Sequence, residues 1–355
     1  MHTLGLHFNE LLVAIQPPQD RLDAARDLPP KIRDYLKNHE TFKTLNPHSR
    51  LVGSYAQHLS VGDVKDVDIL VRVDGDPEAN EPAAKKLIEE LRAALDGLPD
   101  ALGFEGWAGV DIERARRSVH VYIKGPDFHF DVVPCIAPSD FDEKVWVPDR
   151  GFNEWIESHP LGFVKLLEDL TAEYGAKVRN LGRLLKHSRN VQMKTRQPKS
   201  YWLGAMLVDH VQNTLDMDQP LAVLFRDLLD AIYAKFQPVL NLGNGATPNI
   251  PDPLLGHNVS WNWERSHFET FMSRVDDCRK WATKAIEADD RAVAISYWRK
   301  IFGDDFPETV EEAAKAAAAV GAPGIARVTA AGTLAAAISP VRTIPVRPTT
   351  YHGET

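Results

Sequence analysis

Hydrophobic residues recur at helical spacing along the start of the chain. Residues 4–15 and 21–36 both place apolar side chains three or four positions apart, which predicts amphipathic helices. Pro29 and Pro30 fall inside the second stretch and are expected to divide it into two shorter helices, because proline lacks an amide hydrogen and clashes with the preceding turn. We expect residues 1–50 to pack along the outside of the lobe that follows.

Between residues 51 and 150 the pattern changes to short runs rich in β-branched and aromatic residues. Residues 66–73, 118–124 and 128–133 have the composition of strands. Residues 82–95 return to helical spacing. Strands mixed with a helix predict an α+β lobe built on a mixed sheet.

From residue 151 onward the spacing is helical almost throughout. The expected helices span residues 161–174, 178–193, 200–214, 221–236, 263–288 and 290–301. A stretch rich in glycine, asparagine and proline, residues 241–253, is expected to form a long loop. Residues 151–307 therefore predict an all-helical second lobe. Residues 308–355 are alanine-rich and then proline- and threonine-rich, which predicts a disordered tail.

Composition is that of an ordinary globular protein of two lobes. The 355 residues are 44% apolar and 26% charged, enough to bury a large core. The two cysteines, Cys135 and Cys278, form no CxxC pair and are expected to be reduced thiols. We see no apolar run of membrane-spanning length and no signal peptide, so we expect a cytoplasmic protein without a membrane partner. The net charge of −9 disfavours a nucleic-acid partner but is compatible with small triphosphates carried with Mg²⁺.

Three aspartates are the candidate catalytic residues. Asp66 and Asp68 alternate on one predicted strand and so project from the same face. Asp131 lies on another strand, and the three carboxylates converge if the two strands are neighbours. Hard oxygen ligands suit Mg²⁺, with Mn²⁺ as a substitute, and two such ions can clamp the attacking and leaving oxygens of a phosphoryl transfer. The alternative is a solvated strand end, but inward carboxylates on so apolar a strand are costly without a cation.

Other residues close to these aspartates in the sequence are candidates for the same site. Gly53 and Ser54 form a small-residue turn just upstream, where the backbone can approach a phosphate and the hydroxyl and amides can hold it. Alternation places His129 on the face of Asp131, so this histidine, which could pair with His120 across a hairpin, is expected to point toward the site. Neither histidine is expected to bind Mg²⁺, which prefers oxygen.

The order of these motifs resembles that of a known superfamily. Gly-Ser-Tyr at 53–55, Asp-Val-Asp at 66–68 and Phe-Asp-Val-Val-Pro at 130–134 look like the polymerase-β nucleotidyltransferases. More narrowly, they resemble the bacterial cyclic-oligonucleotide synthases related to cyclic GMP-AMP synthase and oligoadenylate synthase, enzymes of anti-phage signalling. The resemblance covers about residues 21–307. It implies a polymerase-β-like core closed by a helical lobe, with two Mg²⁺ ions held by the three aspartates.

Three further site residues are implied by position in that resemblance. Lys186 matches a lysine that contacts the triphosphate, Ser200 a phosphate-contacting residue at a helix start, and Tyr201 a ring that stacks on the nucleobase. The physics agrees, since serine is a good N-cap beside free amides and an aromatic ring can stack on any base. The alternatives are a solvent-facing Lys186 and core packing for Tyr201 and Trp202.

The chain departs from the family in the loop that precedes the first aspartate. Gln57 stands where arginine is frequent and Leu59 where threonine is common. This leaves the handling of the donor nucleotide, and so the identity of the product, open. Trp261 and Trp263 alternate beside a predicted loop and are expected to be packing residues, with cleft lining as the alternative.

The sequence therefore predicts a metal-dependent nucleotidyltransferase. Its expected substrates are nucleoside triphosphates, ATP and/or GTP with pyrimidine nucleotides left open, condensed into a cyclic di- or trinucleotide with release of pyrophosphate. The product would act on a downstream effector. Two alternatives remain: a template-independent transferase acting on RNA or protein, and a catalytically inactive nucleotide-binding sensor.

Overall fold

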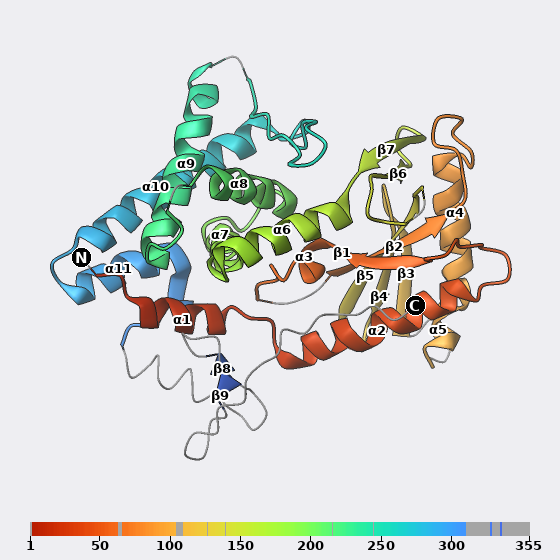
Figure 1. The fold of residues 1–355 in the computed structure, drawn as a ribbon, viewed down its shortest axis with the longest axis horizontal. Coiled ribbons are helices and arrows are strands. Elements are labelled where there is room, and N and C mark those ends of the chain that lie inside the picture. The colour runs from red at the N-terminus through yellow and green to blue at the C-terminus, as the bar shows by residue number, and fades with distance from the viewer. Residues whose placement is uncertain are drawn as a thin grey trace.

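The computed structural model describes most of the chain. The described residues are 2–62, 66–103, 109–125, 127–138, 140–214, 216–243 and 245–309, with two short paired strands, β8 (Arg327–Val328) and β9 (Leu334–Ala335), beyond them. Most of the expected tail at 308–355 lies outside the described residues. A sheet-containing half and a helical half lie side by side (Figure 1).

A mixed seven-stranded sheet forms the first lobe. Its main path runs in the order β1-β2-β5-β4-β3, and β6 joins β5 and carries β7 at its side. The pair β2·β5 is parallel and every other pair in this sheet is antiparallel. The strands are β1 (Ser49–Val52), β2 (Asp66–Val73), β3 (Val110–Arg114), β4 (Val119–Ile123), β5 (Phe128–Ile136), β6 (Val145–Asp149) and β7 (Glu154–Ser158).

The two faces of the sheet bury different side chains. Val67, Ile69 and Val71 face a large cluster shared with helices α2 (Gln19–Lys37) and α4 (Ala84–Ala94). Leu70 and Cys135 face a smaller cluster on the opposite side, against which the start of α6 (Pro160–Tyr174) packs. The short elements α3 (Gly53–Ala56), η1 (Leu95–Gly97) and α5 (Leu98–Ala101) complete this lobe.

Helix α2 is continuous, which corrects the expectation that it divides at Pro29 and Pro30. Ala25, Ile32 and Leu36 are fully buried on either side of the prolines. Their packing against the sheet holds both halves in one helix and outweighs the local cost of two prolines.

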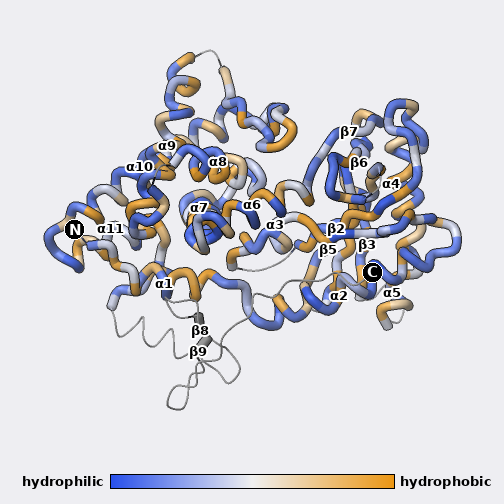
Figure 2. Tube along the Cα trace, viewed as in Figure 1, coloured by the Kyte–Doolittle hydropathy of each residue, from blue (hydrophilic) through white to orange (hydrophobic). Residues whose placement is uncertain are grey.

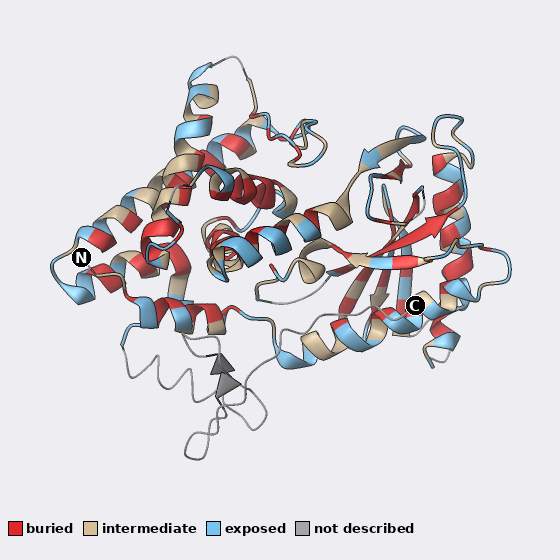
Figure 3. Cartoon of the chain, in the orientation of Figure 1, coloured by how far each residue is buried: buried red, intermediate tan, exposed pale blue. Residues whose placement is uncertain are grey.

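Six helices and one short turn form the second lobe after the sheet. They are α6, α7 (Lys177–Gln192), α8 (Ser200–Asn213), α9 (Leu221–Asn241), α10 (Arg265–Glu287), α11 (Arg291–Phe302) and η3 (Gly303–Asp305). Hydrophobic segments follow the strands and the inner faces of these helices (Figure 2), where the buried residues also concentrate (Figure 3). Among the described residues, no helix has both the length and the apolarity needed to cross a bilayer.

Helix α1 (Gly5–Ala14) belongs with this helical cluster, unlike α2. Phe8 is buried edge-on against Trp298 and Phe306, with ring centroids 4.9 and 5.4 Å away. This differs from the expected packing of residues 1–50 along the outside of the first lobe. The reason is that Phe8 and Leu11 find their apolar partners among α7, α9 and α11 rather than on the sheet.

Strands β3, β6 and β7 were not expected from the sequence. β3 and β7 carry charged residues at alternate and terminal positions, and β6 contains Pro148, which disfavours a strand. Because β7 ends at Ser158, the run of helices begins at Pro160 rather than directly after residue 150.

Candidate functional site

The two strands that carry the three aspartates are neighbours, as convergence of the carboxylates requires. In the parallel pair β2·β5, Asp68 lies directly opposite Asp131, and Asp66 lies opposite His129. Asp66 and Asp68 project from the face that carries Leu70, the face turned toward α6. Val67 is fully buried on the other face.

The carboxyl of Asp68 is electrostatically unusual. Its pKa is raised to about 7, first by burial and then by the neighbouring carboxylates of Asp131 and Asp66. Burial also raises the pKa of Asp131. Repulsion among like charges in a poorly solvated place opposes ionisation, and a divalent cation there would reverse this effect.

Asp131 is held by two residues of the β3–β4 hairpin. The antiparallel register places His120 opposite Asp131, and the His120 Nδ1 contacts Asp131 Oδ1 as an ion pair. Ser118 Oγ donates a hydrogen bond to the same oxygen at 3.4 Å. His129 lies two residues before Asp131 on β5, on the same face, and opposite Asp66 of β2. Its ring stacks on Tyr122 across the strands, with centroids 4.4 Å apart.

The site offers the donors that Mg²⁺ prefers, although the side chains do not enclose one point. In the described part of the chain, no three His, Cys, Asp or Glu side chains converge closely enough to hold one metal ion. The Asp131 carboxylate is instead directed to His120. The donor chemistry nevertheless fits, because Asp66, Asp68 and Asp131 supply only carboxylate oxygens and the ionised Asp68 needs a counter-charge.

Gly53 packs directly on this carboxylate. Strand β1 ends at Val52, and Gly53 and Ser54 begin the short helix α3. Gly53 has φ +72°, and a Cβ at this position would overlap the Asp68 Oδ2. Only glycine tolerates both the positive φ and the close approach of the Asp68 carboxylate without strain. Glycine at this position therefore allows the Gly53-Ser54 backbone to lie against the acidic site.

The loop at residues 56–62, which carries Gln57 and Leu59, is anchored in the helical lobe. Leu59 is buried in the helical-lobe cluster, and a Cβ at Gly182 of α7 would lie 2.8 Å from the Leu59 Cδ2. Arg183 Nε donates to the His58 carbonyl at 3.1 Å. A leucine in place of the frequent threonine thus joins this loop to α7 by apolar packing. Residues 63–65 of this loop lie outside the described residues.

Lys186 faces the acidic site from the helical lobe, so the solvent-facing reading is wrong. Its side chain is buried, and its pKa is lowered to about 8 by burial and by Arg189, while the charge of Asp68 opposes the shift. Arg189, one turn further along α7, donates to the Pro198 carbonyl at 2.8 Å and to Ser200 Oγ at 3.2 Å. Sequence reasoning missed Arg189, although its i+3 spacing from Lys186 placed it on the same side of the helix.

Ser200 is the first residue of α8 and not its N-cap, which corrects the capping expectation. The cap position is Lys199, and no side chain caps this helix end. The Ser200 hydroxyl instead accepts the hydrogen bond from Arg189. Ser200 therefore lies beside the Arg189 guanidinium.

Tyr201 combines a packed ring with a fixed hydroxyl. Its ring lies 4.9 Å from that of Phe163, and its hydroxyl donates to Asp252 Oδ2 at 2.7 Å. Burial and the Asp252 carboxylate raise the pKa of the phenol. Tyr201 and Trp202 both line one cavity, and Trp202 is in addition buried in the helical-lobe core.

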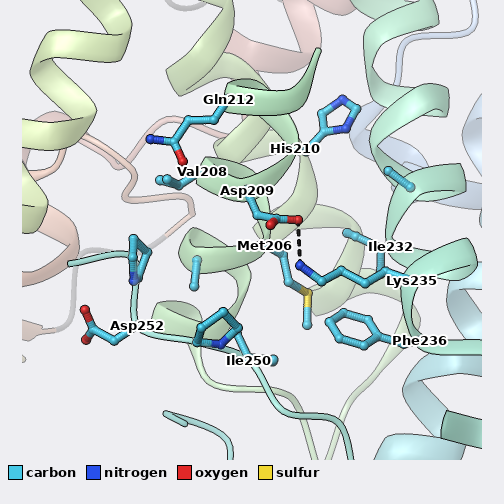
Figure 4. A pocket seen from close by; sticks show the side chains of 14 residues that line it. Met206, Val208, Asp209, His210, Gln212, Ile232, Lys235, Phe236, Ile250 and Asp252 are labelled. Atoms are coloured by element: carbon cyan, nitrogen blue, oxygen red, sulfur yellow. Dashed lines mark ion pairs between the residues drawn. The ribbon is translucent and has the colours of Figure 1, made fainter. Parts of the chain in front are cut away.

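That cavity is a cleft of about 820 Å³ between the two lobes, within the size range of small-molecule sites. The β6–β7 hairpin supplies one wall, and the start of α8 with residues 257–261 supplies the other. A second cavity of about 210 Å³ lies between α8, α9 and residues 250–253 (Figure 4). It contains the Asp209–Lys235 ion pair and is lined by none of the predicted site residues.

Comparison with known proteins gives consistent matches. Residues 2–170 match the domain family described as Second Messenger Oligonucleotide or Dinucleotide Synthetase. The Cyclic AMP-AMP-AMP synthase of Acinetobacter sp. (strain ATCC 27244 / 9458) is 26% identical over 309 residues, 86% of each chain. That of Escherichia coli (strain MS 115-1) is 22% identical over 305 residues, 81% of this chain and 91% of the relative.

Solved structures share the fold at low identity. The Bradyrhizobium diazoefficiens CD-NTase CdnG in complex with GTP has a TM-score of 0.66 at 15% identity, covering 89% of this chain and 98% of that one. E. coli MS115-1 CdnC with ATP has a TM-score of 0.64 at 18% identity, covering 85% and 98%. These similarities agree with a mixed-sheet core joined to a helical lobe.

Proposed function

We propose, from the similarity of this chain to the bacterial cyclic-oligonucleotide synthases of the polymerase-β nucleotidyltransferase superfamily, that it condenses nucleoside triphosphates into a cyclic di- or trinucleotide. Pyrophosphate leaves at each condensation. One observation carries the proposal: Asp68 and Asp131 lie opposite each other on β2 and β5, with Asp66 beside them and Lys186 facing Asp68. This arrangement places acidic and basic groups where a metal-bound triphosphate needs both.

Residues of both lobes contribute to the proposed reaction. Gly53 lets the Gly53-Ser54 turn pack against the Asp68 carboxylate, because a Cβ there would overlap the Asp68 Oδ2. The Ser54 hydroxyl and the nearby amides are assigned to holding the triphosphate beside it. Lys186, Arg189 and Ser200 contact its phosphate oxygens from the helical lobe. Asp131, oriented by His120 and Ser118, accepts the proton of the attacking ribose hydroxyl.

Two Mg²⁺ ions, or Mn²⁺ in their place, would be held by Asp66, Asp68 and Asp131. When bound, they supply charge neutralisation at the triphosphate and make the attacking hydroxyl more acidic. The raised pKa of Asp68 supports this assignment, because its carboxylate is unfavourable until a cation compensates it. The Tyr201 ring, which lines the cleft, is assigned to stacking on a nucleobase.

ATP is the first substrate to test. Two of the relatives that match most of the chain are named as cyclic AMP-AMP-AMP synthases, and the structural neighbours include complexes with ATP and with GTP. These names support ATP or GTP as substrates and a ring of two or three nucleotides. In this proposal the product is a cytoplasmic second messenger that activates an effector during phage infection.

Pyrophosphate release tests the chemistry. The protein is incubated with ATP, GTP, CTP and UTP, each alone and together, in the presence of Mg²⁺ or Mn²⁺. We expect metal-dependent pyrophosphate release that is lost in the double variant Asp66→Ala, Asp68→Ala. Release that is equal in the double variant would remove these aspartates from the mechanism. Release only when RNA or a protein acceptor is added would favour a macromolecular transferase.

A further inference from the structure

The interlobe cleft has a second aromatic surface that the proposed mechanism does not use. Trp261 lines the cleft with 55% of its side chain exposed, although tryptophan is usually among the more buried residues. Its neighbours Ser260 and Trp263 are both buried. The expectation that both Trp261 and Trp263 are packing residues therefore holds for Trp263 alone.

The loop that carries Trp261 is fixed on several sides. Ser260 Oγ donates to the Pro248 carbonyl at 2.6 Å, and Trp202 Nε1 donates to the Val259 carbonyl at 2.9 Å. Upstream, Asp252 accepts from the amides of Leu254 and Leu255 while it holds the Tyr201 hydroxyl. An exposed indole on such a fixed loop loses little conformational entropy when a ligand stacks on it.

A basic wall faces the cleft close to the aspartates. Arg117 lines it from the core lobe, one residue from the Ser118 that contacts Asp131, and Lys199 lines it from the helical lobe. Within the described residues, no carboxylate lies within ion-pair distance of Lys199. Arg116 lies above the Trp261 ring, with its guanidinium 6.0 Å from the centroid.

Most carboxylates that line the cleft already have partners. Asp149 forms ion pairs with Arg116 at 2.8 Å and with Arg117 at 3.5 Å, so Arg117 shares this carboxylate with Arg116. Glu157 is paired with Lys144, and Asp252 accepts from Tyr201. Only Glu154 among the acidic lining residues remains to oppose an anion at Lys199.

We propose that this part of the cleft retains the linear oligonucleotide intermediate, with one base stacked on Trp261 and a phosphate held by Lys199 and Arg117. A stacking ring beside cationic groups is the combination that binds single-stranded nucleotides. The inference rests on the proposed function, because an intermediate exists only if condensation proceeds in steps. Retention matters chemically, since a linear product that leaves before the second or third bond forms cannot be cyclised.

Binding of a defined probe tests the inference without turnover. The probe is the 5′-phosphorylated diadenylate pApA, titrated by calorimetry into the full chain, with Trp261→Ala, Trp261→Phe and Lys199→Gln as variants. Loss of one stacked base predicts about 5- to 150-fold weaker binding by Trp261→Ala, largely restored in Trp261→Phe. Leu242→Ala is the matched control, an apolar side chain that is 61% exposed and outside the cleft.

The products give a second, independent readout. With ATP as substrate, we expect Trp261→Ala and Lys199→Gln to raise the ratio of linear to cyclic oligonucleotides, measured by mass spectrometry, while Leu242→Ala does not. Equal pApA affinity in wild type and Trp261→Ala, or no pApA binding by the wild type, would overturn the inference. A wild type that binds pApA through Trp261 but releases no pyrophosphate would instead count against the proposed function alone.

Discussion

Replacing Asp68 with asparagine should stabilise the metal-free protein at alkaline pH. The pKa of this carboxyl is about 7 in the folded protein, against 3.8 for an unperturbed aspartate. The folded state therefore holds its proton more tightly than the unfolded chain does. Stability from this group is fully present below about pH 3.8 and is lost as the pH rises toward 7, because the unfolded chain ionises first.

The size of the effect follows from the same two values. At about 1.4 kcal/mol per pKa unit, the difference corresponds to an upper bound of about 4 kcal/mol. Asp68 is only partly buried, so solvent screening reduces this to about 2–4 kcal/mol. Asparagine keeps the shape of the protonated carboxyl and carries no charge at any pH.

Urea unfolding in EDTA, followed from pH 4 to pH 8.5, measures the effect. We expect Asp68→Asn to exceed the wild type by about 2–4 kcal/mol at pH 8 and to lose this advantage as the pH falls toward 4. The exposed Asp289→Asn is the matched control and should follow the wild type. A difference that does not change with pH, or an asparagine variant less stable at pH 8, would refute the electrostatic account of the site.

Three further predictions concern single side chains. Gly53→Ala should lower stability by about 1–3 kcal/mol in thermal unfolding and abolish pyrophosphate release, because its methyl group would overlap the Asp68 carboxylate and its backbone would keep a positive φ. Normal turnover would contradict this close approach. Lys186→Met should weaken ATP binding at least about tenfold because the contact of the lysine to phosphate is lost, and it should lower the melting temperature little because a buried cation is removed. Unchanged ATP affinity in calorimetry would place this lysine outside the site. Tyr201→Phe should lose about 0.5–1.5 kcal/mol of stability because its hydrogen bond to Asp252 is removed, whereas Tyr201→Ala should also weaken nucleotide binding by about 1–3 kcal/mol. A lowered melting temperature with unchanged nucleotide affinity in Tyr201→Ala would mean that Tyr201 is a packing residue.

Strong periodicity made most long elements predictable. The expected helices at 161–174, 178–193 and 221–236 correspond to α6, α7 and the first part of α9, and the strand at 66–73 is β2. Alternation along β2 placed Asp66 and Asp68 on one face without knowledge of the fold. The parallel pairing with β5 that sets Asp68 opposite Asp131 is a long-range contact, which local pattern cannot fix and which the family resemblance implied.

The missed features depend on register and packing. His120 rather than His129 contacts Asp131, because antiparallel pairing with β4, and not position along β5, decides which side chain lies opposite. Arg189 and the fixed loop under Trp261 depend on contacts between segments far apart in sequence. The two prolines of α2 predicted a break that does not occur, because burial of the apolar face of this helix outweighs the low helix propensity of proline.

Mass spectrometry of phosphatase-resistant products tests the central claim most directly. The wild type and the Asp66→Ala, Asp68→Ala variant are incubated with the four ribonucleoside triphosphates and Mg²⁺ or Mn²⁺, and terminal phosphates are then removed enzymatically. The account predicts a resistant oligonucleotide of two or three residues, with the mass of a ring, made by the wild type and absent from the variant. Products that are all linear, or a ring made equally by both proteins, would contradict it.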